Sequence, residues 1–296
     1  MPGLTLRPAT DRDVERAGDV NFVAFYHAAL THGLRPAVTS PADSRRYLRH
    51  LFAVDPLGGM VAEEDGEVVA VGWVHRRGPV ATIGPLAVDP RVQGRGIGRQ
   101  LLERCIEAVG SGVPQVRLVQ ESYNTASLGL YLRTGFRIVA PLLELELPAG
   151  VALVPPDPGG AVTVRAARSD DRPRVVARDA RAFGAERPQS VNLYLERGRV
   201  LIAERGTTLV GYALGIAFQG MAYLGSASAD DADVLLHLLS TLAVEVGAGE
   251  AVLRTHVPAT DRRLVGGLTQ LGFRVFRAAH YMVRGGGTPP PPTSAA

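Results

Sequence analysis

The segment from Val88 to Arg99 constrains the fold of this chain more than any other. It reads Val-Asp-Pro-Arg-Val-Gln-Gly-Arg-Gly-Ile-Gly-Arg and joins a predicted strand, 81–88, to a predicted amphipathic helix, 93–109. Three glycines in the opening turns of a helix cost about 1 kcal/mol each relative to alanine. Without Cβ atoms, however, backbone amides at a helix N-terminus can approach an anion closely, and the helix dipole favours negative charge there. The segment therefore predicts a site for a bulky anion such as a diphosphate.

Two other phosphate-binding folds do not fit this segment. A dinucleotide-binding fold places its glycines directly after the first strand, with an acidic residue about 20 positions later. Here the glycines follow the fourth predicted strand. A phosphate-binding loop that ends in Gly-Lys is excluded because every basic side chain of this chain is arginine. A glycine-rich turn that binds no ligand is the structural alternative.

Apolar periodicity and turn signals predict alternating strands and helices in the first half of the chain. Asp65-Gly66 favours a hairpin, and Ser40-Pro41 is typical of a helix start. The predicted strands are 4–7, 59–63, 67–75, 81–88, 116–120 and 136–147. The predicted helices are about 10–30, one that starts at 41, 93–109 and 125–133. This order indicates an α/β fold, a mixed sheet flanked by helices.

The second half of the chain repeats the first in outline. Val162–Arg165, followed by Ser-Asp-Asp after three residues, resembles Leu4–Arg7 followed by Thr-Asp. Leu271–Val275 likewise resembles Thr134–Ile138. The order of predicted strands and helices also agrees, so we interpret the halves as copies of one unit.

Composition marks the boundaries between these copies. Residues 148–160 are rich in proline and glycine and form a predicted linker, and the low-complexity tail 285–296 is predicted to be disordered. The expected domains are therefore residues 1–147 and 161–284.

Charge and cysteine content exclude several classes of protein. The chain has 296 residues, a formal net charge of +3 and arginines scattered among acids, which argues against a nucleic-acid-binding surface. A single cysteine allows no intrachain disulfide or cysteine-rich metal site. The sequence shows neither an apolar run of membrane-spanning length nor a signal peptide. We expect a cytoplasmic protein without a metal, nucleic-acid or membrane partner.

A second motif makes the function more specific. Residues Asn124–Phe136 read Asn-Thr-Ala-Ser-Leu-Gly-Leu-Tyr-Leu-Arg-Thr-Gly-Phe. With Gln93–Gly98, they resemble the two signatures of the GNAT acyltransferase superfamily, Gln-x-x-Gly-x-Gly after strand four and Asn-x-x-Ala-x-x-Leu-Tyr-x-x-x-Gly-Phe. Ser127 stands where alanine is usual. The resemblance covers residues 1–147 well and residues 161–284 only as a fold outline. It implies two tandem GNAT-like domains.

The resemblance also implies the cofactor and its contacts. Acetyl-CoA, or another acyl-CoA, would bind by its diphosphate at the glycine-rich helix start and by its pantetheine arm along the preceding strand. The expected cofactor-binding residues are Leu86, Ala87, Val88, Arg91, Gln93, Gly94, Arg95, Gly96, Ile97, Gly98, Arg99, Asn124 and Ser127.

The implied reaction is an N-acetyl transfer by direct attack of a primary amine on the thioester in a ternary complex. A thiolate leaving group, with a pKa near 8.5, can take a proton from a phenol, and Tyr131 is the expected general acid. Its alternative role is that of a core tyrosine. Glu121, just after a strand, is the expected base; a solvated loop carboxylate is the alternative, and Glu63, Glu64 and His75 are weaker candidates.

The second half has lost the ligand motif. Ala227–Asp233 carries three aspartates where the glycines should stand, and these would repel a diphosphate. Counting back from Gly-Phe, Leu268 replaces Tyr131 and Asp261 replaces Asn124. We therefore expect this half not to bind acyl-CoA. A non-catalytic acyl-CoA sensor or scaffold is the alternative to an enzyme. The sequence does not identify the amine acceptor, the acyl chain or the oligomeric state.

Overall fold

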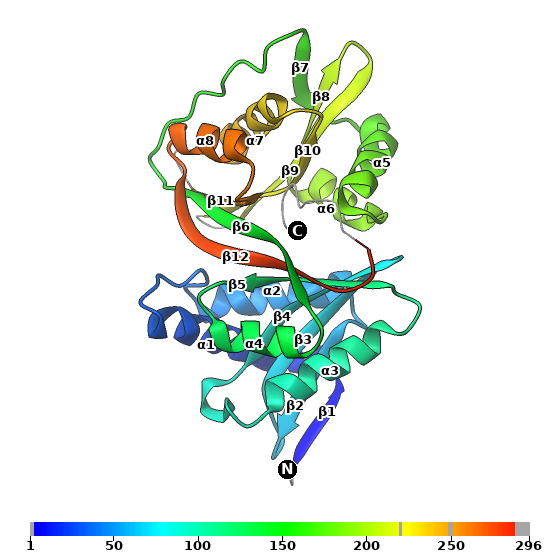
Figure 1. Ribbon diagram of the computed structural model, residues 1–296, viewed down its shortest axis with the longest axis vertical. Coiled ribbons are helices and arrows are strands. Elements are labelled where there is room, and N and C mark those ends of the chain that lie inside the picture. Colours follow the sequence, from blue (N-terminus) through cyan, green and yellow to red (C-terminus); the bar gives the residue numbers. More distant parts are fainter. Residues whose placement is uncertain (1–2, 219–220, 248–250, 288–296) are drawn as a thin grey trace. The chain divides into compact units, whose positions relative to one another are not determined.

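The computed structural model describes residues 3–218, 221–247 and 251–287 (Figure 1). Most of the tail expected at 285–296 lies outside these residues. The chain divides into two compact units. The first comprises residues 1–137 with 282–286, and the second is built on residues 138–281. Each unit has the mixed α/β architecture that the sequence predicts.

The first unit is a mixed sheet with strand order β1-β2-β3-β4-β5. Strands β1 to β4 are antiparallel to their neighbours, and β4 and β5 are parallel. Ser40 caps α2 by accepting a hydrogen bond from the amide of Asp43, as the Ser-Pro signal predicts. The elements are β1 (Leu4–Pro8), α1 (Val14–Thr31), α2 (Pro41–Val54), β2 (Gly59–Glu64), β3 (Glu67–Arg77), β4 (Val80–Val88), α3 (Ile97–Val109), β5 (Gln115–Glu121) and α4 (Thr125–Arg133).

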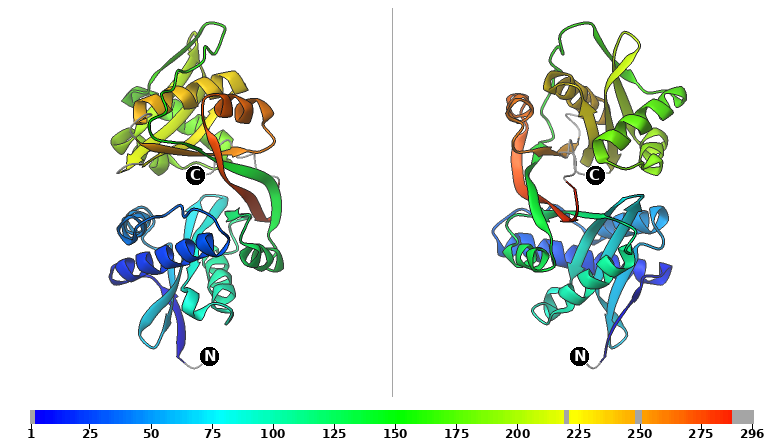
Figure 2. Two further views of the ribbon diagram at one scale, coloured as in Figure 1. Left: turned by 90° about the vertical axis from the view of Figure 1, so that its left-hand side faces the viewer. Right: turned by 45° about the vertical axis from the view of Figure 1, so that its right-hand side comes forward.

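Helices cover both faces of this sheet (Figure 2), and a hydrophobic core lies on each face. On one face, α1 and α2 pack around the fully buried Trp73 of β3. On the other, α3 packs through Leu101, Leu102 and Cys105, as its apolar periodicity predicts. Cys105 is buried and burial raises the pKa of its thiol to about 12, so it is a core residue.

The second unit repeats this arrangement. Its strand order is β12-β6-β11-β10-β9-β8-β7, with α7 and α8 packed on one face and α5 and α6 on the other. The elements are β6 (Arg137–Leu147), β7 (Val162–Ala166), α5 (Arg172–Phe183), α6 (Pro188–Arg197), β8 (Arg199–Arg205), β9 (Thr208–Phe218), β10 (Met221–Ala229), α7 (Ala232–Val246), β11 (Val252–Pro258), α8 (Arg262–Gln270) and β12 (Arg274–Gly285).

An ion triad occurs once in each unit with the same bonds. In the first, Arg7 donates to Asp13 at 2.7 Å and to Glu63 at 2.9 Å. In the second, Arg165 donates to Asp171 at 2.7 Å and to Glu204 at 2.9 Å.

The hydrogen bond from the arginine has the same effect on both aspartates. Asp13 and Asp171 both have a pKa lowered to about 2, chiefly by the arginine hydrogen bond. Because side chains far apart in sequence recur with one geometry, the triads strongly support the duplication predicted from the sequence.

The two units exchange the ends of their sequence copies. Strand β6 is the last strand of the first copy in the sequence, yet it lies in the second unit, antiparallel to β11. Conversely, Met282–Gly286 belongs to the first unit, where Gly286 donates to the carbonyl of Pro114 at 3.3 Å. The compact units divide after Arg137, ten residues before the boundary expected at residue 147.

Met282 tests this assignment because it is fully buried in the α3 core of the first unit. We expect Met282→Ala to lower the free energy of unfolding by about 2–4 kcal/mol, since it leaves a cavity in that core. Chemical denaturation measures the change. Val275→Ala on the same strand is the control, because Val275 is 56% exposed and its loss should change stability by only about 0.5 kcal/mol. Equal effects of the two changes would contradict the assignment.

Candidate active site

The glycine-rich segment forms a loop and a helix start, not a helix throughout. The prediction that this helix begins at Gln93 was wrong. A 3-10 turn, Pro90–Val92, comes first, and helix α3 begins at Ile97. Gly94 and Gly96 have φ angles of 77° and 79°, in the left-handed region that disfavours any side chain and ends helical geometry. Only Gly98 lies inside the helix, where a Cβ would meet the Val88 side chain at 3.3 Å.

The start of α3 exposes main-chain groups. Gly96 is its N-cap residue, so no side chain caps the first turn in the described part of the chain. A Cβ built on Gly94 or Gly96 would have no described atom within 4 Å. The amides of the first turn therefore face open space that side chains at these two positions would fill. This geometry fits an anion at the positive end of the helix dipole.

The arginines around this helix start are already paired. Arg91 binds Asp89 at 2.8 Å, Arg95 binds Glu64 at 2.5 Å, and Arg99 binds Glu103 at 2.8 Å. An incoming anion would compete with these carboxylates for the guanidinium groups. Attraction of an anion to this site therefore depends more on the main-chain amides than on the charge of these arginines.

Side-chain hydrogen bonds hold the loop against the end of β4. Gln93 Nε2 donates to the carbonyl of Val88 at 2.8 Å. Asp89 is buried and accepts from the amide of Arg91 at 3.0 Å. A hydrogen bond from the Arg91 side chain is the main cause that lowers the pKa of Asp89, which stays ionised.

The parallel ladder between β4 and β5 is short. Val80–Thr82 pairs with Gln115–Arg117, and the register ends there. Leu86, Ala87 and Val88 are paired with β3 only. The backbone of β4 beyond Thr82 thus has no ladder partner in β5, the arrangement in which an extended ligand could pair with a strand.

Asn124 and Ser127 form the cap of helix α4. Asn124 Oδ1 accepts from the amide of Ser127 at 3.0 Å, and Ser127 Oγ donates to the carbonyl of Asn124 at 2.9 Å. Gln120 Nε2 also donates to that carbonyl at 2.9 Å. The first role of both residues is therefore local, in starting the helix.

Tyr131 lies on the buried side of α4. It is 8% exposed and makes an edge-to-face contact with Phe136, with ring centroids 5.8 Å apart. Burial, assisted by the nearby Cys105 thiol, raises the pKa of Tyr131 well above its usual value. The phenol therefore keeps its proton at neutral pH and can act only as a donor of that proton.

Glu121 ends β5, close in sequence to the α4 cap. It is half-buried, and its backbone carbonyl accepts from the amide of Asn124 at 3.0 Å. The weaker candidates are engaged elsewhere: Glu63 belongs to the Arg7 triad and Glu64 binds Arg95.

The second unit has side chains where the first unit has the bare start of α3. Asp231 caps α7 by accepting from the amide of Val234 at 2.9 Å, where α3 has only Gly96. A Cβ on Gly225 of β10 would lie 2.7 Å from the hydroxyl of Tyr194. Leu268, which replaces Tyr131, is fully buried. Asp231 thus supplies at α7 the side-chain cap that α3 lacks.

The structure also brings together three residues that the sequence left apart, Asp55, His75 and Arg77. Asp55 follows α2, and the other two alternate along β3. The period-2 alternation of a strand places His75 and Arg77 on one face. No local pattern connects them with an aspartate 20 positions earlier.

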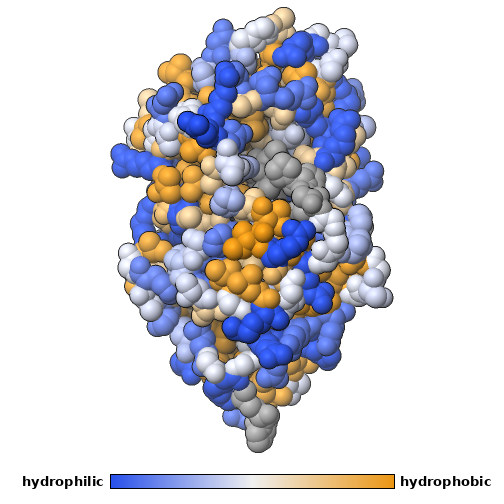
Figure 3. Space-filling view, viewed as in Figure 1, coloured by the Kyte–Doolittle hydropathy of each residue, from blue (hydrophilic) through white to orange (hydrophobic). Residues whose placement is uncertain are grey.

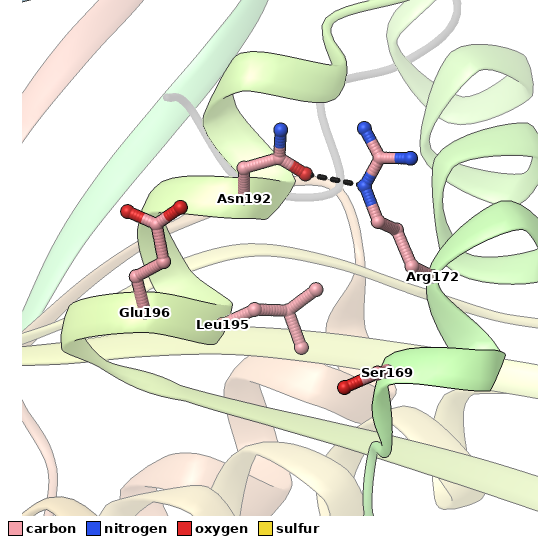
Figure 4. A pocket seen from close by; sticks show the side chains of 5 residues that line it. All are labelled: Ser169, Arg172, Asn192, Leu195 and Glu196. Carbon is pink, nitrogen blue, oxygen red and sulfur yellow. Dashed lines mark hydrogen bonds between the residues drawn. The ribbon is translucent and has the colours of Figure 1, made fainter.

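The second unit contains a separate surface pocket of about 290 Å³ (Figure 4). It is lined by Ser169, Arg172, Asn192, Leu195 and Glu196, none of which the motifs single out. Arg172 Nε donates to Asn192 Oδ1 at 2.5 Å across it.

The described ranges contain no group of three or more His, Cys, Asp or Glu side chains placed to hold a metal ion. Among the same residues, no helix is long and apolar enough to cross a membrane. On the face shown in Figure 3, hydrophilic and hydrophobic residues are interspersed.

Solved structures share this fold over nearly the whole chain. A Pyrococcus horikoshii protein superposes with a TM-score of 0.77 at 21% identity, covering 97% of this chain and 91% of that one. A GCN5-related N-acetyltransferase from Sphaerobacter thermophilus gives 0.72 at 18% identity, covering 97% and 96%. A tandem GNAT protein from the clavulanic acid biosynthesis pathway gives 0.64 at 15%, covering 96% and 99%.

Sequence relatives match a shorter part of the chain. A mycothiol acetyltransferase of Propionibacterium freudenreichii is 33% identical over 147 residues, 47% of this chain and 44% of that protein. One from Streptomyces avermitilis is 36% identical over 122 residues, 40% and 37% respectively. The chain therefore spans less than half the length of these relatives.

Two family models match the chain, one in each sequence copy. Residues 26–136 match the acetyltransferase (GNAT) family, and residues 175–295 match an acetyltransferase (GNAT) domain. Because the two matches together span well over half of the sequence, the chain belongs to the GNAT acetyltransferase family, with two GNAT domains in tandem.

Proposed function

We propose that this protein is an N-acetyltransferase that transfers an acetyl group from acetyl-CoA to a primary amine, with one active site in the first unit. The observation that carries the proposal is the bare start of α3, where Gly94 and Gly96 leave main-chain amides facing open space. The acetyl group is suggested by the names of the relatives. The names of these relatives do not assign the amine acceptor of this chain, because the alignments cover less than half of each protein.

In this proposal the cofactor contacts follow the chain from β4 into α3. The amides of Gln93 through Arg99 bind the diphosphate. The unpaired edge of β4 at Leu86–Val88 pairs with the pantetheine amides and polarises the thioester carbonyl through its N–H groups. Asn124 and Ser127 border the pantetheine arm. When bound, acetyl-CoA supplies the activated acyl group.

Two side chains move protons. Tyr131, protonated at neutral pH because burial raises its pKa, donates to the departing thiolate. An alkylammonium, with a pKa near 10.4, must lose a proton before it attacks, and we propose that Glu121 takes it directly or through water. The amine attacks the carbonyl directly, so no acyl group passes through Cys105.

The first prediction concerns the helix start. Gly96→Ala should weaken CoA binding about tenfold or more, because a Cβ would fill the space beside amides that make charge-assisted hydrogen bonds. Isothermal titration with CoA measures this. Gly110→Ala is the control: Gly110 ends the same helix, also at positive φ (80°) and with no described atom near a Cβ. Equal CoA affinity in both variants would contradict the proposed site.

The second prediction concerns the proton donor. Tyr131→Phe keeps the ring packing but should lower kcat about 100-fold, a typical contribution of general acid catalysis. Thiol release from acetyl-CoA with a panel of amines measures it. Tyr212→Phe, which removes a buried hydroxyl from the second unit, should leave kcat unchanged. Unchanged turnover in Tyr131→Phe would remove Tyr131 from the mechanism. CoA binding without turnover of any amine would favour an acyl-CoA sensor.

The third prediction concerns stoichiometry. The protein should bind one equivalent of CoA, because Asp231 caps α7 with a negative charge where a diphosphate would lie. Calorimetric titration of the full chain gives the number of sites. A second equivalent that persists in Gly96→Ala would show that the second unit binds the cofactor after all.

A further inference from the structure

A buried polar cluster supports the strand that the proposed function assigns to the thioester. His75 Nδ1 lies 2.5 Å from Asp55 Oδ2, and its Nε2 lies 3.2 Å from the carbonyl oxygen of Gly84 on β4. Arg77 donates to both carboxylate oxygens of Asp55 at 2.8 Å. The side chains of Asp55 and His75 are only 16% and 17% exposed. The cluster thus connects the end of α2 with β3 and β4.

Gly84 lies at an irregularity of β4. The β3–β4 register shifts between Gly72 and Val74, so that Gly84 and Pro85 stand opposite Trp73 alone. The register with β5 has already ended at Thr82. Such a bulge leaves an extra residue outside the ladder and re-aims the strand beyond it. The His75 side chain therefore meets a carbonyl that neither register pairs.

Each nitrogen of the His75 ring faces one hydrogen-bond acceptor. Burial alone would raise the pKa of Asp55, but hydrogen bonds from His75 and Arg77 outweigh it and hold that pKa far below its usual value. Asp55 is therefore a carboxylate, and it can only accept. The Gly84 carbonyl also only accepts. The ring of His75 therefore lies between two acceptors, the Asp55 carboxylate and the Gly84 carbonyl.

The second sequence copy provides a comparison within the same chain. Its β9–β10 pair has the same bulge, between Leu224 and Ala227. The register places Ile216 opposite Tyr223, as His75 is opposite Thr82. The copy that lacks the bare helix start thus also lacks the histidine. There, Arg187 donates to Ser226 at 2.5 Å, beside Gly225.

We infer that His75 is a positioning residue for acyl transfer, which holds the Gly84 carbonyl and so fixes the direction of Leu86–Val88, the segment that pairs with the pantetheine arm. Asp55 orients the imidazole, and Arg77 holds Asp55. The inference rests on the acyl-CoA site proposed above. His75 touches no reacting atom in this role; it acts through the main chain of β4.

Two ligands distinguish positioning from general stability. CoA carries the pantetheine arm, whereas ADP 3′-phosphate is the same nucleotide without it. In His75→Leu we expect the affinity for CoA to fall about tenfold, the ratio for the loss of one hydrogen bond. The affinity for ADP 3′-phosphate, which needs only the start of α3, should not change. Calorimetric titration of the full chain measures both.

Two further variants complete the test. His237→Leu removes a ring contact with a backbone carbonyl, that of Pro156 at 2.6 Å, from the second unit, and should affect neither ligand. If His75→Leu does not fold, His75→Gln, which can donate to only one of the two acceptors, should show a smaller loss for CoA alone.

The outcomes separate the two proposals. An unchanged CoA affinity in the His75 variants, or an equal loss for both ligands, would overturn the positioning role while leaving the acyl-CoA site intact. A wild-type chain that binds neither ligand would overturn the proposed function, and the role of His75 with it.

Discussion

The function proposed for this chain depends on one interaction, the attraction of an anion to the uncapped main chain at the start of α3. Nearby arginines would ordinarily be credited with that attraction. Here Arg91, Arg95 and Arg99 are each bound to a carboxylate, so their charge is largely compensated. What distinguishes the site is the absence of side chains at Gly94 and Gly96, whose backbone conformation tolerates few other residues. The paired arginines hold the loop, and the loop presents the amides.

The two copies in the chain separate what the fold requires from what the ligand requires. Both keep the Arg-Asp-Glu triad, the short parallel ladder and the bulge that follows this ladder along the strand. Asn124 and Asp261 even make the same cap hydrogen bond, at 3.0 Å each. These features therefore serve the fold. Three differences bear on the proposed reaction: Gly96 against Asp231, Tyr131 against Leu268 and His75 against Ile216. Each removes a feature that the proposed reaction uses.

The sequence was informative where a signal is local and less so where it is not. Helix α4 was predicted to its end residues, because Asn124 caps it and Gly135 follows it. The start of α3 was misplaced because apolar periodicity does not report the positive φ of Gly94 and Gly96. The Arg95–Glu64 ion pair and the His75–Asp55 contact join residues 31 and 20 positions apart in the chain. Only the folded sheet brings those partners together.

The sequence did not predict the exchange of strands either. Strands β6 and β12 both follow a Gly-Phe turn and both suit the last place in a GNAT-like sheet, so neither carries a signal for one partner over the other. Without Met282–Gly286, strand β5 of the first unit would be a bare edge, and part of the α3 core would be empty. The copy that has lost the ligand motif therefore still supplies a piece of the unit that keeps it. Loss of the glycine-rich motif in the second copy did not remove the need for its last strand.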